Sequence, residues 1–297
     1  MLANVNGTRI FFDIEGLQYV PDGPKMREKP VCFVIHGGPG SDHANFLPDT
    51  SVLSETMQLI YVDDRNCGRS DRGDITTSSM EQNVEDLEAL RKMLGLKKFF
   101  ILGHSYGGMK AQLYMMKYPE NLHGVILAGT CGGSLATGKR RERIEQHIKE
   151  WGTPEQYQVF LDDMEFDGKY TFNEFMIKMG SLYHHKLDTE EEYQEMVNCL
   201  TRSIKNNEVN AYQNTHDMGN FNFLEDLKKV KNVPTLILSG EYDFVTDVES
   251  GRELHESIEG SEFHIVKDSA HALFSDRPDY VFPCINDFVA RNFKPEA

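Results

Sequence analysis

A serine, an acid and a histidine that could together cleave an acyl bond occur in this sequence in loops that follow predicted strands. Ser105 is the centre of Gly-His-Ser-Tyr-Gly at 103–107, a G-x-S-x-G pattern. Small residues around a serine permit a sharp strand-to-helix turn that exposes its hydroxyl. An ordinary glycine-rich turn has the same letters, but a strand predicted over 99–102 and a helix predicted after the motif favour a nucleophile.

The residues that would activate this serine follow it in the order acid, then histidine. Asp243 comes just after a strand predicted over 235–238, and His271 comes just after one predicted over 263–266. His271 would take the Ser105 proton and return it to the leaving group, while Asp243 would orient the imidazole. Glu241 and Asp247 are competing candidates for the acid; we favour Asp243, which lies closer to its strand, and expect Asp247 to cap the next helix.

An acyl-transfer enzyme also needs donors for the oxyanion. We expect them to be the amides of Tyr106, directly after the nucleophile, and of Gly38, in the His-Gly-Gly-Pro-Gly loop at 36–40. A phosphate-binding loop is the alternative, but no Lys-Ser/Thr follows and no G-x-G-x-x-G is present, so we expect no nucleotide. The chemistry requires neither a metal nor an organic cofactor.

Strands alternating with helices must position these residues. A hairpin is predicted over 2–14 around Asn6-Gly7, and a helix begins at Ser79, with Gln82 three residues on. Further strands are predicted over 31–35, 59–62 and 125–128, and a closing helix has an apolar face of Tyr280, Val281, Ile285, Phe288 and Val289. This order predicts an α/β fold with a mostly parallel central sheet and helices on both faces.

The alternation stops between residues 131 and 232, where the sequence is charged and helix-like. We interpret this segment as a helical insertion, or cap, in a core made of 1–130 and 233–297. If a free amino terminus is the ligand, a carboxylate of the cap should meet it above Ser105. The candidate acids are Glu155, Asp162, Asp163, Glu165, Glu174, Glu208 and Asp217. The aromatic residues of the cap are Trp151, Tyr157, Phe160, Phe172, Phe175, Tyr183 and Tyr212, which would wall an apolar pocket or form the cap's own core.

The composition excludes several classes of protein. The chain has 297 residues and a formal net charge of −16, which repels nucleic acid and anionic lipid. We see neither a signal peptide nor an apolar stretch that could span a membrane. Five widely spaced cysteines fit neither a disulfide framework nor a zinc site, so we expect a cytoplasmic protein.

Three motifs together resemble the proline iminopeptidase family of α/β-hydrolases, serine peptidase family S33. They are the loop at 36–40, Asp-Asp-Arg-Asn-Cys-Gly-Arg-Ser at 63–70, and the serine motif extended to Gly108. The resemblance implies a helical cap, the triad Ser105, Asp243 and His271, and an oxyanion hole of Gly38 and Tyr106. Asp64 and Asn66 depart from the family's second motif, which has Gln and Gly there.

The motifs and the resemblance predict an enzyme that hydrolyses a small amide or peptide through an acyl-enzyme on Ser105, releasing an N-terminal residue such as proline. An esterase or lactonase with the same triad is the alternative among enzymes. A ligand-binding protein that kept the fold without catalysis is the alternative from another class. The expected partner is therefore a small molecule or short peptide.

Overall fold

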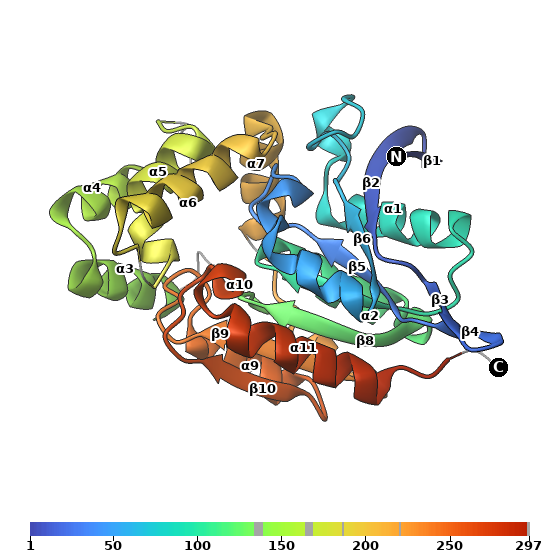
Figure 1. Ribbon diagram of the computed structural model, residues 1–297. Helices are drawn as coiled ribbons and strands as arrows, with labels where there is room; N and C mark the ends of the chain where they lie inside the picture. Colours follow the sequence, from blue (N-terminus) through green and yellow to red (C-terminus); the bar gives the residue numbers. More distant parts are fainter. Residues whose placement is uncertain (134–138, 164–168, 186, 220, 296–297) are drawn as a thin grey trace.

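A twisted eight-stranded sheet forms the centre of the molecule (Figure 1). The computed structural model describes residues 1–133, 139–163, 169–185, 187–219 and 221–295. The strands follow one another across the sheet as β1 (Leu2–Val5), β2 (Thr8–Glu15), β6 (Gln58–Val62), β5 (Val31–Ile35), β7 (Phe99–His104), β8 (Leu122–Ala128), β9 (Thr235–Gly240) and β10 (Glu262–Val266). From β6 to β10 all neighbours are parallel, whereas β1 and β2 are antiparallel additions. The predicted mostly parallel sheet is confirmed.

The first two strands form the hairpin that the sequence predicts. Val5 pairs with Thr8, so Asn6 and Gly7 make a two-residue turn. Both turn residues have positive φ, 44° and 79°, as a tight hairpin turn requires and as Asn-Gly tolerates. A separate two-stranded ribbon, β3 (Tyr19–Asp22) and β4 (Lys25–Glu28), follows.

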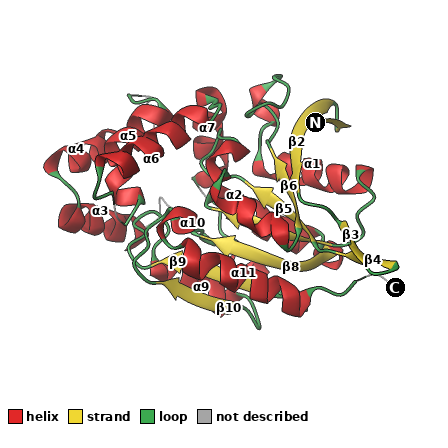
Figure 2. Cartoon of the chain, in the orientation of Figure 1, coloured by secondary structure: helices red, strands yellow, loops and turns green. Residues whose placement is uncertain are grey.

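Helices cover both faces of the sheet (Figure 2). One face packs against α1 (Met80–Met93), α2 (Tyr106–Lys117) and α9 (Val248–Ser257), and the other against α11 (Pro278–Asn292) and the short 3₁₀ helix η2 (Asp49–Glu55). Successive strand residues point to opposite faces, so Phe33 belongs to the first layer of the core and Val34 to the second. Because both faces are covered, the central strands are continuously apolar.

Two details of the helices test the sequence patterns. The side chain of Ser79 caps α1 by accepting a hydrogen bond from the amide of Gln82 at 3.2 Å, as expected. In contrast, the assignment of Tyr280 to the apolar face of α11 was wrong. Tyr280 is 38% exposed, and its hydroxyl lies 2.9 Å from Nδ1 of His264. An amphipathic tyrosine at the edge of a helical face can keep its hydroxyl in contact with water.

The predicted insertion is helical. Between β8 and β9 the chain forms α3 (Lys139–Trp151), α4 (Pro154–Asp163), α5 (Phe172–Tyr183), α6 (Glu190–Arg202), α7 (Asn207–Gln213), the π-helix η5 (Asn214–Met218) and α8 (Leu224–Leu227). We call α3 to α8 the inserted helices; α3 to α6 extend away from the sheet at the left of Figure 1. Ile148, Val159, Met179 and Leu182 form a small core there, which also includes Phe244 from the loop after β9. The boundaries at 130 and 233 stay predictions.

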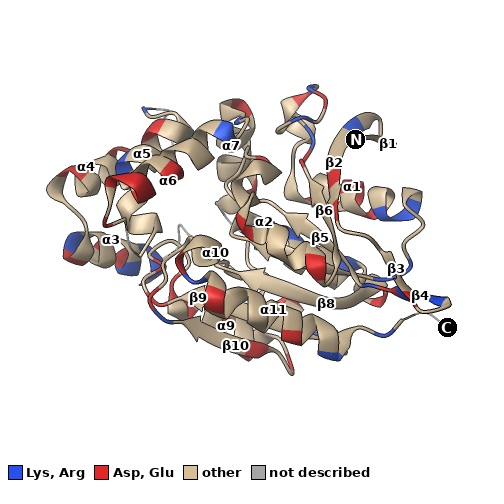
Figure 3. Cartoon of the chain, in the orientation of Figure 1, with Lys and Arg blue, Asp and Glu red and all other residues tan. Residues whose placement is uncertain are grey.

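Charged residues are interspersed on the outer helices, whereas β8 carries none (Figure 3). In the part of the chain that the structure describes, no helix is both long and apolar enough to cross a membrane. The five cysteines are free thiols. A short helix, α10 (Leu273–Asp276), connects the loop after β10 to α11.

Candidate active site

Ser105 lies at a sharp turn between β7 and α2. Its φ and ψ are 54° and −123°, a conformation that non-glycine residues rarely adopt. The turn is possible because its neighbours lack side chains: a Cβ on Gly103 would lie 2.4 Å from the carbonyl oxygen of Gly107, and one on Gly107 would lie 2.1 Å from that of Ile35. Strained backbone of this kind is typical of a nucleophile at the end of a strand.

His271 and Asp243 come together at the carboxyl ends of the neighbouring strands. Nδ1 of His271 lies 2.8 Å from Oδ2 of Asp243. The same carboxylate accepts hydrogen bonds from the Thr246 hydroxyl at 2.6 Å and from the amides of Val245 and Thr246 at 2.8 and 2.9 Å. Burial alone would raise the pKa of Asp243, but the imidazole of His271 and these donors lower it well below the usual range. The carboxylate is therefore charged and fixed in orientation.

The two competing acids are occupied elsewhere. Glu241 forms an ion pair with Lys267 at the surface. Asp247 caps α9 by accepting a hydrogen bond from the amide of Ser250 at 2.9 Å, and it also pairs with Arg143. The predicted capping role of Asp247 is confirmed.

The other histidines near the site have structural contacts. Nε2 of His104 lies 3.0 Å from the carbonyl oxygen of His271, and burial lowers the pKa of His104 to about 3. Nε2 of His36 accepts a hydrogen bond from the amide of Asp64 at 3.2 Å, and burial, followed by the charge of Lys110, lowers the pKa of His36. Both rings are neutral at physiological pH.

The glycine loop after β5 lies directly against Ser105. A Cβ on Gly37 would be 2.8 Å from the carbonyl oxygen of His104 and 2.9 Å from Cβ of Ser105. The next residue, Gly38, has a φ of 47°, which glycine adopts without strain. In the described part of the chain, no acceptor receives a hydrogen bond from the amide of Gly38 or of Tyr106.

A cavity of about 480 Å³ joins these residues. Ser105, His271, Gly38 and Tyr106 line it, while Asp243 lies behind His271. The walls come from the inserted helices as well as from the sheet side. The other described lining residues are Gly37, Pro39, Asn45, Phe46, His104, Met109, Arg141, Ile144, Phe160, Tyr170, Thr171, Phe175, Met176, Tyr183, Asn207, Asn210, Ala211, Asn214, Met218, Gly219, Phe244, Val245, Thr246 and Phe274.

None of these described lining residues is an aspartate or a glutamate. The predicted cap acids have other roles: Glu155 pairs with Lys178, Asp162 with Lys169, Glu174 caps α5, Glu208 is exposed, and Asp217 is buried against Tyr106. The side chain of Asp163 and the whole of Glu165 lie outside the described residues. Among the described residues that line the cavity, Arg141 is the one lysine or arginine.

Three of the predicted aromatic residues, Phe160, Phe175 and Tyr183, line the cavity. Trp151 is 58% exposed, Tyr157 packs at the edge of the small core of the inserted helices, and the hydroxyl of Tyr212 donates to the carbonyl of Thr76. The side chain of Phe172 lies outside the described residues. The apolar wall is therefore built from only part of the aromatic set.

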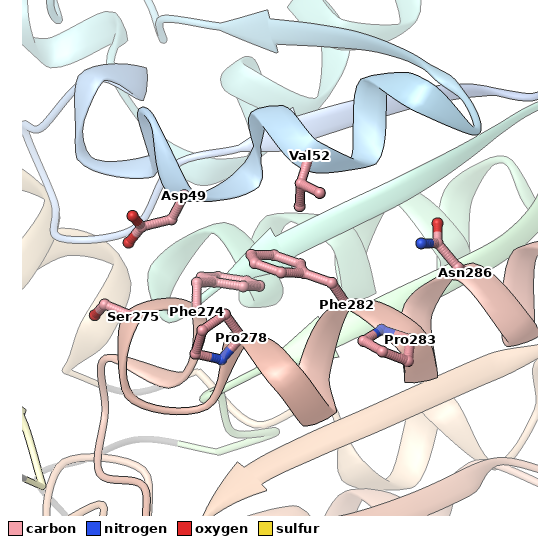
Figure 4. A pocket seen from close by; sticks show the side chains of 8 residues that line it. All are labelled: Asp49, Val52, Phe274, Ser275, Pro278, Phe282, Pro283 and Asn286. Atoms are coloured by element: carbon pink, nitrogen blue, oxygen red, sulfur yellow. The ribbon is translucent and has the colours of Figure 1, made fainter.

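A second cavity, of about 530 Å³, opens at the surface between η2 and α11 (Figure 4). Val52 lies on one side of it, and Phe282, Pro278 and Pro283 lie on the other. Phe274 lines both this cavity and the one that contains Ser105. None of the predicted site residues lines the second cavity.

Asp64 and Asn66, the two residues of the motif at 63–70 that differ from the family pattern, each form contacts in the interior. Asp64 forms an ion pair with the fully buried Lys110 and accepts a hydrogen bond from Asn83 at 3.2 Å. Asn66 has a φ of 62°, and its side-chain amide donates to the hydroxyl of Ser78 at 2.8 Å. Asparagine tolerates this backbone region, so it replaces glycine without blocking the turn.

A family model described as the alpha/beta hydrolase fold matches residues 30–278. The chain belongs to this family. This α/β hydrolase is 29% identical over 264 residues to a proline iminopeptidase of Saccharolobus solfataricus, covering 86% of this chain and 83% of the relative. The predicted resemblance is confirmed, and the chain is a hydrolase.

Solved structures of this fold superpose along nearly the whole chain. A proline iminopeptidase of Mycobacterium smegmatis aligns with a TM-score of 0.76 at 16% identity, covering 98% of each chain. An esterase of Exiguobacterium antarcticum aligns with a TM-score of 0.73 at 22% identity, covering 96% of this chain and 97% of its own. At these identities the superpositions show a common fold.

Proposed function

We propose that this hydrolase works through an acyl-enzyme on Ser105. His271 acts as general base and then as general acid, and Asp243 orients its imidazole and stabilises the imidazolium. The observation that carries the proposal is the 2.8 Å contact between Nδ1 of His271 and Asp243, with Ser105 and His271 lining one cavity. That contact leaves Nε2 of His271 as the nitrogen that can serve the serine.

The amides of Gly38 and Tyr106 complete the proposed machinery as the oxyanion hole. Gly37 holds the loop against Ser105, and α2 begins at Tyr106, so its amide is one of the helix N–H groups without an intrahelical acceptor. Donors fixed before the reaction stabilise the tetrahedral intermediate without reorganisation.

The first candidate substrate is a small peptide or amide with a free N-terminal residue, in the manner of a proline iminopeptidase. The curated relative from Saccharolobus solfataricus supports this candidate, and the aromatic wall suits a proline ring. The second candidate is a small ester or lactone. The described cavity wall favours it, because that wall presents Arg141 and no carboxylate to an ammonium group.

A pair of substrates that differ only at the amino terminus tests the choice. Prolyl-p-nitroanilide and its N-acetyl derivative would be compared with p-nitrophenyl acetate, using Ser105→Ala as the blank. An aminopeptidase should lose nearly all kcat/KM on acetylation. Equal or faster cleavage of the acetylated substrate would reject the first candidate and leave the ester or lactone.

Ser105→Ala also tests the proposed role of Ser105 as the nucleophile. Ser105→Ala and His271→Ala should each lower kcat by several orders of magnitude, while circular dichroism stays that of the wild type. A fluorophosphonate probe should label the wild type and not Ser105→Ala. Wild-type turnover in either variant would refute the assignment, and a wild type inert to every substrate and to the probe would favour a ligand-binding protein.

A further inference from the structure

Hydrogen bonds join the glycine loop of the active site to helix α7 of the inserted helices. The amide of Asn206 donates to the carbonyl of Gly40 at 2.8 Å, and the side-chain amide of Asn210 donates to the carbonyl of Pro39 at 2.8 Å. The amide of Gly40 in turn donates to Oε1 of Gln213 at 3.1 Å. The two backbones are so close that a Cβ on Gly40 would lie 2.3 Å from the carbonyl oxygen of Asn206.

The π-helix η5, which directly follows α7, holds the side chain of Tyr106. The tyrosine hydroxyl donates to Oδ2 of Asp217, in η5, at 2.6 Å, and the amide of Met80 donates to the same oxygen at 3.0 Å. Burial, together with the charge of Asp217, raises the pKa of Tyr106 well above its usual value, so the hydroxyl remains a donor. The tyrosine ring lies 5.2 Å from the buried ammonium of Lys110, a cation–π contact.

Gln213 is the central residue of this arrangement. It is fully buried, and its amide nitrogen donates to the carbonyl of Ser78 at 2.7 Å while its oxygen serves Gly40. An apolar residue there would leave the amide of Gly40 and the carbonyl of Ser78 unsatisfied in the interior, which costs more than one ordinary hydrogen bond. Asn210 and Met218, from the same stretch, line the catalytic cavity.

We propose that residues 206–218, from the residue before α7 to the end of η5, form a clamp that positions both donors of the oxyanion hole, with Gln213 and Asp217 as its positioning residues. One arm fixes the loop that contains Gly38, and the other fixes Tyr106. Residues of the clamp also line the cavity, so a substrate group that contacts them helps to hold the oxyanion donors in place. The binding energy of that contact therefore raises kcat. This proposal rests on the proposed oxyanion hole.

The test combines kinetics with a transition-state analogue. Gln213→Met and Tyr106→Phe, which retains its own amide, should each lower kcat for p-nitrophenyl acetate about 10- to 100-fold, while KM changes less than threefold. The Ki of a boronic acid, which forms a tetrahedral adduct with the serine, should rise by the same factor as kcat/KM falls. The readout is the correlation between the boronate Ki and kcat/KM across the variants, because loss of stability alone does not produce such a correlation.

Thr189→Ala is the matched control. It removes the capping box of α6, also among the inserted helices, and should lower the free energy of unfolding without changing kcat or the boronate Ki. All assays would be run below the melting temperature of the weakest variant. If Gln213→Met does not fold, Tyr106→Phe decides alone.

Two results would overturn the clamp. In one, folded clamp variants keep the wild-type kcat and Ki; in the other, Thr189→Ala loses as much kcat as they do. The proposed function fails separately, if Ser105→Ala retains turnover or the boronate does not inhibit the wild type. A dead Ser105→Ala with fully active clamp variants therefore rejects the clamp alone.

Discussion

Asp243 and Asp247 are four residues apart, yet their surroundings give them different tasks. Asp243 faces His271 and is buried, whereas Asp247 begins a helix and pairs with Arg143. Asp243→Asn should lower kcat by roughly 10⁴-fold, because an amide favours the wrong imidazole tautomer. Asp247→Asn should leave kcat within a few-fold and cost at most about 1 kcal/mol of stability, because asparagine still caps the helix and only the ion pair with Arg143 and the charge at the helix N-terminus are lost.

Steady-state kinetics and urea unfolding of the two variants check this prediction. Asp247→Asn serves as the control for Asp243→Asn, since both remove one carboxylate from the same loop. Strong loss of kcat in Asp247→Asn with an active Asp243→Asn would transfer the role of acid to Asp247.

Burial of His104 should make the stability of the protein depend on pH. Its pKa is about 3 in the folded chain, against 6.5 as the reference value, because the ring is buried. As the pH falls below 6.5, the unfolded chain takes up a proton that the folded chain does not bind, so stability is lost on acidification. This one group should account for about 2–3 kcal/mol between pH 7 and pH 4.5.

Urea unfolding of the wild type and His104→Gln at the two pH values measures this contribution. The wild type should lose more stability between pH 7 and pH 4.5 than His104→Gln does. Parallel slopes for the wild type and His104→Gln would contradict the prediction.

At the scale of elements, two helical glycines differ in what surrounds them. A Cβ on Gly251 of α9 would lie 2.1 Å from the hydroxyl of Ser239 and 2.7 Å from the ring of Phe263, both on strands. A Cβ on Gly180 of α5 would meet only the flexible end of Met196. Alanine gains about 1 kcal/mol of helix propensity over glycine. Overpacking a rigid site costs about 1–3 kcal/mol.

Gly251→Ala should therefore destabilise the protein, and Gly180→Ala should be neutral or stabilising by up to about 1 kcal/mol. Thermal and urea unfolding of the two variants give the sign directly, and each substitution is the control for the other. A stabilised Gly251→Ala would mean that α9 moves away from β9 at little cost.

The elements also show where reasoning from the sequence succeeds. The hairpin at Asn6-Gly7, the cap at Ser79 and the parallel strands depend on local patterns, and the structure confirms them. The clamp was missed because its contacts join residues that lie 111 positions apart, as Tyr106 and Asp217 do, or as many as 173 apart, as Gly40 and Gln213 do. Thr246, three residues after Asp243, was also missed, although an Asp with a Thr at this spacing is a local signal of a turn.

Asp217 shows why a charge in the sequence does not define a site. It was a candidate for binding a substrate ammonium, but the fold buries it against the Tyr106 hydroxyl and the Met80 amide. Composition indicates that the inserted helices are acidic, and only the tertiary arrangement decides which carboxylates face the cavity. None of the described lining residues is an aspartate or a glutamate.

At the scale of the whole molecule, the net charge of −16 should act on substrates before they reach the cavity. A negative molecule raises the local concentration of cations, and this field is screened as the Debye length falls from about 30 Å at 0.01 M salt to less than 10 Å above 0.1 M. For a cationic ester such as acetylcholine, kcat/KM should therefore fall several-fold between 10 and 300 mM NaCl. For neutral p-nitrophenyl acetate it should stay constant.

The neutral ester is the control for effects of salt on the enzyme itself, and the ratio of the two kcat/KM values isolates the electrostatic part. Arg141 at the cavity wall has the opposite sign to the molecule as a whole. If the local charge dominates, kcat/KM for the cationic ester rises with salt, which contradicts the prediction. In that case Arg141→Gln should abolish the rise of kcat/KM with salt. If kcat/KM instead falls with salt in both the wild type and Arg141→Gln, the attraction comes from the net charge.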